Sequence, residues 1–247
     1  MNSNLIKQSL ISIVILVLSY HQVDAQKSMG TLSESPDLYN YVLSEYGPDQ
    51  VLINGLYPED YILDATGHPF LLDTVFHSGY LVLHHKKFEN VYLQYNIFDQ
   101  NIIVTTHVGE NGYLQVIPPN KFVSEFKMDN KLFRKYCFDG ANEHYYQVVY
   151  DGSIRFLYSY AKKRFVSYNR SKYSTFTFSK EARKSYLLID QKLCEFKNLG
   201  SFLQCFPESR VPGIKAYCKK EKINFSRATD QEIEKLMNYC DQEIPKS

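Results

Sequence analysis

The stretch Leu81–Val104, LVLHHKKFENVYLQYNIFDQNIIV, decides the fold class of this chain. Within it, Val91, Leu93 and Tyr95 alternate with residues that are mostly more polar. Alternate residues of a strand point to opposite faces of a sheet, so a period of two predicts a β-strand with one buried face. The run ends at Asp99–Asn101, where turn-forming residues precede a second apolar run. The stretch therefore predicts two antiparallel strands joined by a turn.

The same period of two extends over residues 51–197, for example in Ile154–Tyr160. Asn-Gly and Asp-Gly pairs between the runs supply the positive φ angles that tight hairpins require. We therefore expect eight to ten short strands in a meander, a sandwich or a partly open barrel. The predicted turns are Asp99–Asn101, Glu110–Gly112, Pro118–Asn120, Met128–Asn130 and Asp151–Ser153.

From about residue 198 the period changes to that of an α-helix, and three short helices are predicted. The last opens with Thr229 and Glu232, which form a capping box that satisfies free amides at the helix start. The whole is an α+β chain: a mainly antiparallel β-sheet followed by about three short C-terminal helices. The residues that share the apolar faces are Phe202, Cys205 and Phe206, then Ile214, Tyr217 and Cys218, then Ile233, Leu236, Met237 and Cys240.

The N-terminus has the pattern of a secretory signal peptide. Lys7 precedes the apolar run Leu10–Leu18, and a small residue, Ala25, ends the polar stretch that follows. A membrane anchor is the alternative, but the run is well short of the roughly 20 apolar residues that span a bilayer. We expect cleavage after Ala25 and a soluble exported protein, periplasmic or extracellular. Residues 26–247 would form one mature domain, with an N-terminal segment 26–50, a β-rich part 51–197 and a helical part 198–247.

Charge is distributed unevenly along the chain. Residues 31–85 contain no Lys or Arg and carry a net charge of −8, whereas residues 155–184 carry +8, with Glu181 as the only acid. Basic residues interleaved with aromatic rings can bind an anionic polymer through ion pairs and stacking. Because an exported protein rarely meets nucleic acid, we expect an anionic glycan, a lipid headgroup or another envelope protein instead. The candidate binding residues are Arg155, Tyr158, Tyr160, Lys162, Lys163, Arg164, Arg170 and Lys172.

Two structural alternatives explain the same charges. The acidic N-terminal third could pack beside the basic stretch within one molecule, or both could be ordinary solvated faces. Under either alternative, the basic stretch would need no partner.

The histidines suggest a competing function, that of a metal-dependent hydrolase using His68, His77, His84, His85 and His107. A zinc site needs three or four ligands converging at about 2 Å. Adjacent strand residues point to opposite faces, so a regular strand over Leu81–Lys87 would place the adjacent pair, His84 and His85, on the two faces of the sheet. The remaining candidate ligands, His144, Asp64 and Asp73, add no familiar metal-binding spacing. We interpret the histidines as sheet-surface residues.

No other catalytic motif and no cofactor fingerprint is found. The favoured interpretation is therefore a non-enzymatic protein that binds or scaffolds a component of the cell envelope. The chain also has five cysteines but no C-x-x-C motif. Exported chains meet oxidising conditions, and if a disulfide forms we favour Cys218 with Cys240, on the apolar faces of neighbouring helices. The alternative is that Cys205, Cys218 and Cys240 are small buried apolar residues without a bridge.

Five segments carry a resemblance to other proteins. They are YGPDQVLINGLYPED, GHPF, NVYLQYNIFDQNIIV, KSYLLIDQKLCEFKNLGSFLQCFPE and ATDQEIEKLMNYC. Together they resemble a group of uncharacterised exported proteins of Bacteroidetes-type bacteria, over most of the mature chain. The resemblance implies a periplasmic or surface location and carries no activity or site residues with it.

Overall fold

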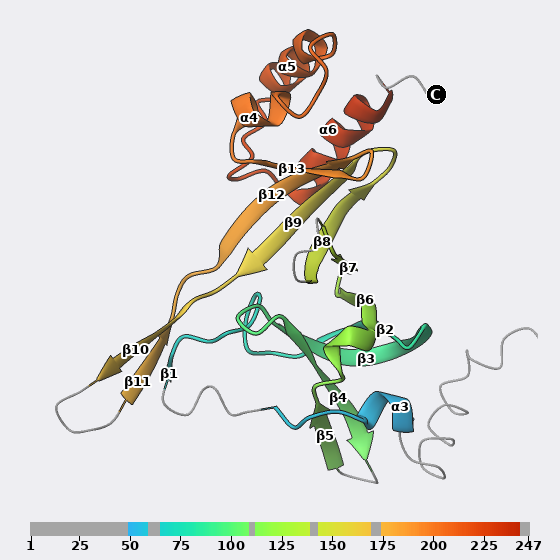
Figure 1. Cartoon of the computed structure of the whole chain (residues 1–247), viewed down its shortest axis with the longest axis vertical. Helices are drawn as coiled ribbons and strands as arrows, with labels where there is room; N and C mark the ends of the chain where they lie inside the picture. The colour runs from blue at the N-terminus through green and yellow to red at the C-terminus, as the bar shows by residue number, and fades with distance from the viewer. Residues whose placement is uncertain (1–48, 59–64, 109–111, 139–142, 169–173, 243–247) are drawn as a thin grey trace, which may run out of the picture. The chain divides into compact units, whose positions relative to one another are not determined.

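A computed structural model describes residues 49–58, 65–108, 112–138, 143–168 and 174–242 (Figure 1). The chain divides into two compact units, residues 1–47 and 48–247, and every described residue belongs to the second. The predicted signal peptide and nearly all of segment 26–50 lie outside the described residues.

Ten strands form one sheet in which every neighbouring pair is antiparallel. In sheet order they are β13 (Lys192–Phe196), β12 (Ala182–Ile189), β9 (Arg155–Ala161), β8 (His144–Asp151), β7 (Lys131–Tyr136), β6 (Val123–Met128), β2 (His77–Leu83), β3 (Lys86–Asn96), β4 (Asn101–Val108) and β5 (Gly112–Val116). Neighbours in the sheet are also neighbours in sequence except at β12–β9 and β6–β2, so the sheet is largely a meander. The predicted fold class is confirmed.

The remaining strands form a second, three-stranded sheet with the order β1 (Ala65–Thr66), β11 (Ser174–Phe178), β10 (Arg164–Tyr168). This makes thirteen strands among the described residues, more than the eight to ten expected. The antiparallel pair β10–β11, here called the arm, follows β9 in the chain and leads into β12 (Figure 1). Two strands of the main sheet thus continue into the arm.

The three predicted C-terminal helices are confirmed as α4 (Leu199–Leu203), α5 (Val211–Lys220) and α6 (Asp230–Gln242), beside β12 and β13 in Figure 1. The predicted capping box is also confirmed: the Thr229 amide donates to Glu232 Oε2 at 2.8 Å, and the Glu232 amide donates to Thr229 Oγ1 at 3.3 Å. Earlier in the chain lie the short helix α3 (Gln50–Ile53) and the 3₁₀ turn η1 (Asn120–Phe122).

The main core joins one face of the sheet to the helices. Its aromatic rings form a continuous path: Phe156 of β9 contacts Phe196 of β13, which contacts Phe202 of α4 and Phe225 of the α5–α6 loop. Each of these rings is at most 6% exposed. A smaller cluster gathers around Tyr146, Val148, Leu157, Tyr186 and Leu188.

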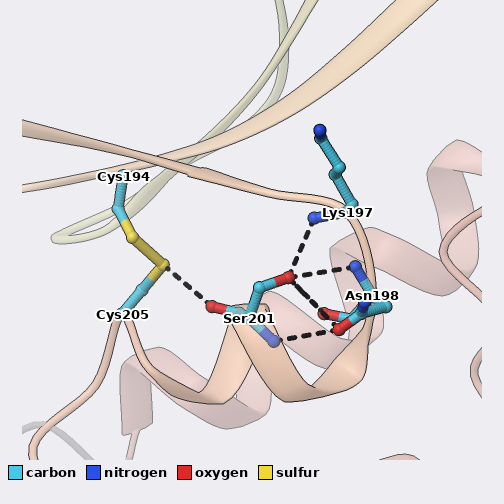
Figure 2. Close-up of a disulfide and its surroundings, with 5 residues drawn as sticks. All are labelled: Cys194, Lys197, Asn198, Ser201 and Cys205. Carbon is cyan, nitrogen blue, oxygen red and sulfur yellow. Dashed lines mark hydrogen bonds between the residues drawn. A yellow bond between two sulfur atoms is a disulfide. The ribbon is translucent and has the colours of Figure 1, made fainter.

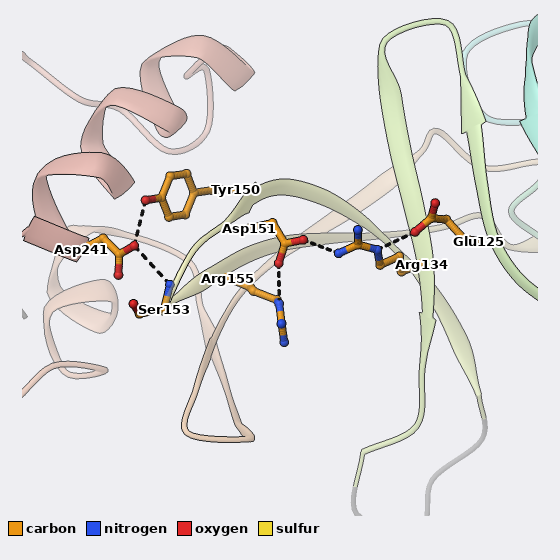
Figure 3. Close-up of polar contacts among 7 residues, drawn as sticks. All are labelled: Glu125, Arg134, Tyr150, Asp151, Ser153, Arg155 and Asp241. Carbon is orange, nitrogen blue, oxygen red and sulfur yellow. Dashed lines mark hydrogen bonds and ion pairs between the residues drawn. The ribbon is translucent and has the colours of Figure 1, made fainter. Parts of the chain in front are cut away.

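Helix α6 is attached to the sheet near both of its ends. At its start, Asp230 Oδ2 accepts hydrogen bonds from Lys131 Nζ at 3.0 Å and Gln147 Nε2 at 2.7 Å. Near its end, Asp241 Oδ2 accepts from the Tyr150 hydroxyl at 2.9 Å and the Ser153 amide at 3.1 Å (Figure 3). These polar contacts fix the helix along the sheet in addition to its buried apolar face.

The disulfide joins Cys194 of β13 to Cys205, which follows α4, and not Cys218 to Cys240 (Figure 2). The chain reverses direction at Asn198, whose side chain accepts from the Ser201 amide at 3.0 Å as the cap of α4. This reversal brings the end of the helix back to the strand. The expected pair is buried and reduced, and burial raises the pKa of the Cys218 thiol to about 11 and that of Cys240 to about 12.

Two hairpin turns escaped the sequence analysis. Leu83 pairs with Lys86, so His84 and His85 form a two-residue turn, with φ angles of 51° and 63°. The expected regular strand over Leu81–Lys87 is therefore wrong. Asp190–Gln191 forms the same kind of turn between β12 and β13. Neither pair contains the glycine that usually marks such turns, although histidine and aspartate are among the residues that tolerate positive φ.

Residues 65–71 connect the small sheet to the main sheet. At one end, Ala65 and Thr66 pair with β11. At the other, the Leu71 amide donates to the Tyr95 carbonyl at 2.9 Å, and Phe70 forms a bridge with Asn96. One short segment is thus hydrogen-bonded to the arm and to β3.

Candidate binding surface

The predicted basic stretch begins in β9 with Arg155, whose charge is already paired. Its Nε donates to Asp151 Oδ1 at 2.6 Å, and Arg134 donates to the other oxygen of the same carboxylate. Arg134 also donates from Nε to Glu125 Oε2 at 2.6 Å, so four charged side chains form a row across β6, β7, β8 and β9 (Figure 3). Arg155 therefore contributes to a structural network.

The electrostatics of the row follow from its partial burial. Burial alone would raise the pKa of the Asp151 carboxyl, but hydrogen bonds and charges from Arg134 and Arg155 outweigh it and hold the pKa below its usual range. The same row reaches β2, where the Tyr80 hydroxyl donates to Glu125 Oε1 at 2.7 Å. Burial and this carboxylate raise the pKa of Tyr80 to about 12.

The aromatic rings expected to stack on a ligand belong to the core instead. Tyr158 is 0% and Tyr160 is 6% exposed. Tyr160 donates its hydroxyl to Gln147 Oε1 at 2.5 Å, and the guanidinium of Arg183 lies 4.3 Å from the centre of the Tyr158 ring. Neither ring presents a face to an external partner.

Lys162, where the chain leaves β9, is bound internally. Its Nζ donates to the carbonyls of His68 and Phe70, both at 2.8 Å. Burial lowers the pKa of this lysine. The acidic and basic stretches thus meet here through backbone carbonyls. The two described acids of residues 31–85, Asp49 and Asp73, interact with Lys86 and His77 instead.

Among the described cations of residues 162–180, those that are exposed lie on the arm or next to its ends. Arg164 lies between the rings of Phe98 and Phe176, at 5.1 and 5.0 Å, while one side of it faces solvent. Lys163 and Lys180 are exposed, and neither side chain forms an ion pair with another described residue. Two further candidates, Arg170 and Lys172, lie outside the described residues.

Apolar side chains accompany these cations. Phe165 is 55% exposed and Val166 is 46% exposed, on opposite faces of β10. Sequence analysis missed Val166 entirely, because its alternation with Phe165 looks the same as that of the buried strands. The only indication in the sequence is the pair Lys162-Lys163, which interrupts the alternation of apolar and polar residues between β9 and β10.

The histidines do not converge in the part of the chain described here. His77 Nδ1 lies 2.8 Å from Asp129 Oδ2, and its Nε2 lies 3.1 Å from Asp73 Oδ1, so the ring bridges two carboxylates. The ring of His84 packs on Phe122, at 3.8 Å between centres. Among the described residues, no group of three or more His, Cys, Asp or Glu side chains could hold a metal ion. Of the other candidates, His107 belongs to β4 and His144 begins β8, while Asp64 lies outside the described residues.

No helix within the described ranges is long and apolar enough to cross a membrane. No protein family model, no curated protein and no solved structure matches this chain. The arm is therefore characterised by its own residues: Phe165 and Val166 are about half exposed, and next to its ends lie Lys163 and Lys180, which form no ion pair with another described residue.

Proposed function

We propose that this chain is a non-enzymatic binding or scaffolding protein of the cell envelope, which holds an anionic partner on the arm. The observation that carries the proposal is the exposure of Phe165 and Val166, which follow the exposed cations Lys163 and Arg164 in the chain. Apolar side chains beside cations that form no ion pair with another described residue favour a partner that offers both negative charge and apolar surface. The location rests on the signal-peptide pattern of residues 1–25.

Charge reversal on the arm tests the binding proposal. We would measure binding of the full mature chain to polygalacturonate and to vesicles with and without phosphatidylglycerol, and cross-linking to proteins in an envelope fraction. Lys163→Glu and Lys180→Glu should weaken binding, and so should added salt, because exposed charge contacts are screened over about 10 Å at 0.1 M. Lys192→Glu, at an exposed position in β13, is the matched control.

The result distinguishes the partner classes as well. Binding to the acidic glycan, to the anionic vesicles or to an envelope protein would each identify one class. Equal binding by the parent chain and both arm variants, for every probe that binds, would contradict the proposal.

The proposed location has its own test. Intact-mass measurement of the protein isolated from its native cells should give a chain that begins at Gln26. A full-length mass in the cytoplasmic fraction would contradict export.

A further inference from the structure

The outer edge of β10 has the backbone geometry of an open strand-binding site. In the small sheet, β10 has β11 on one side and no other described strand on the other side. Next to its start, the Lys163 carbonyl accepts from the Ser179 amide at 2.8 Å, and the Lys163 amide donates to Ser179 Oγ at 3.0 Å. Inward-facing residues alternate along an antiparallel strand. The amides and carbonyls of Arg164 and Val166 therefore point away from β11.

The side chains of this edge suit an added strand. Phe165 and Val166 lie on opposite faces and are each about half exposed, so a strand beside β10 would cover apolar surface on both faces. Most protein edges are protected by charge, proline or a covering element. β10 instead presents two apolar residues in succession at its centre.

The charge around the edge indicates which strand it accepts. Residues 152–180 contain no Asp or Glu, and Lys163 and Arg164 lie at the start of β10. A second copy of the arm would bring equal charges together, which destabilises strand pairing. An acidic segment would instead place carboxylates near these cations.

We propose that β10 accepts an extended, acidic segment of a partner protein as a fourth strand of the small sheet. This inference rests on the proposed function, because it uses the same arm, and it specifies the partner as a polypeptide. The backbone supplies affinity through the outward groups of Arg164 and Val166, while alternate acidic and apolar side chains of the segment provide specificity.

The test uses a fluorescent, acetylated peptide in which glutamate alternates with valine, measured by fluorescence anisotropy against the full mature chain. Val166→Pro removes one outward amide while leaving the bonds to β11 in place, since proline is tolerated on edge strands. We expect it to weaken binding about tenfold. Val166→Thr keeps the amide and should bind within about threefold of the parent chain. A peptide with lysine in place of glutamate should not bind.

A second measurement does not depend on how the variant folds. The same peptide with alternate amides methylated should lose binding to the unaltered chain, because an added strand needs those donors. If the methylated peptide and Val166→Pro both bind like their parents while Lys163→Glu weakens binding, strand addition is overturned and charge-based binding at the arm stands. If the unmodified peptide does not bind at all, strand addition is likewise overturned, and the glycan and vesicle measurements decide the proposed function separately.

Discussion

The β9–β12 ladder and the arm are two lengths of one two-stranded ribbon, and they differ in what packs against them. In the first length, Phe156 and Tyr158 are 0% exposed, because they lie in the core cluster that also contains residues of the C-terminal helices, where Phe156 packs against Phe196 of β13. In the second, Phe165 and Val166 are about half exposed. Alternation of apolar and polar residues therefore establishes a strand, whereas burial depends on a partner layer elsewhere in the chain.

The largest expected effect compares a ring of helix α4, in the core cluster that covers the β9–β12 ladder, with a ring of the arm. Phe202→Ala removes a fully buried ring that contacts Phe196, Phe206 and Phe225, and it should lower the free energy of unfolding by about 3–5 kcal/mol. Phe165→Ala on the arm should change it by less than about 0.5 kcal/mol. Urea denaturation of both variants measures the difference. Similar losses of stability in the two variants would mean that Phe165 is buried in solution, and the two regions would then not differ in burial.

The disulfide sharpens the comparison on the helical side. Replacing both Cys194 and Cys205 by alanine should lower stability by about 2–3 kcal/mol, since the bridge closes a loop with a sequence separation of 11 residues. Reductant should lower the stability of the parent chain by a similar amount and leave the variant unchanged. Peptide mapping without reductant checks the connectivity, and a linked Cys218–Cys240 peptide would contradict it.

A smaller effect tests how the helices are held on the sheet. Asp241→Ala leaves the Tyr150 hydroxyl and the Ser153 amide without their acceptor, and it should cost about 1–2 kcal/mol. Amide exchange should accelerate in α6 and in the β8–β9 turn, and remain unchanged in the arm. Faster exchange in the arm as well would show that the two regions open together.

A further small effect on stability depends on pH. The folded pKa of Asp151 lies below its unfolded value, so its ion pairs stabilise the fold above about pH 4, and that contribution is lost as pH falls through the folded pKa. Asp151→Asn should therefore cost about 1 kcal/mol at neutral pH and less in acid. Thermal unfolding across the pH range measures this. A constant difference down to low pH would show that the effect is not one of charge.

The features that were predicted correctly from the sequence depend on residues that lie only a few positions apart in the chain. Helix α6 begins where Thr229 and Glu232 cap it, three residues apart, and the turn at Asp151–Ser153 uses an Asp-Gly pair. The turn at His84 and His85 was missed because it lacks the glycine that usually marks such turns, although histidine tolerates a positive φ.

The features that the sequence did not predict depend on distant contacts. The pairing of Cys194 with Cys205 follows from the reversal at Asn198, whereas helix periodicity alone favoured Cys218 and Cys240. In the basic stretch, Tyr158 and Phe165 both belong to alternating runs, yet only Tyr158 lies in the core cluster that includes residues of the C-terminal helices. For this reason the residues of the candidate surface could be predicted as a stretch but not separated into buried and exposed members.

The connection made by residues 65–71 has a mechanical consequence. This segment pairs with β11 at Ala65 and with β3 at Phe70, and Lys162 holds its carbonyls from the other side. It therefore acts as a strut between the ribbon and the sheet. Tension applied to the arm by an attached partner would pass through hydrogen bonds into β3, the third strand from one edge of the ten-stranded sheet. Movement of the arm relative to β3 would therefore have to break these hydrogen bonds.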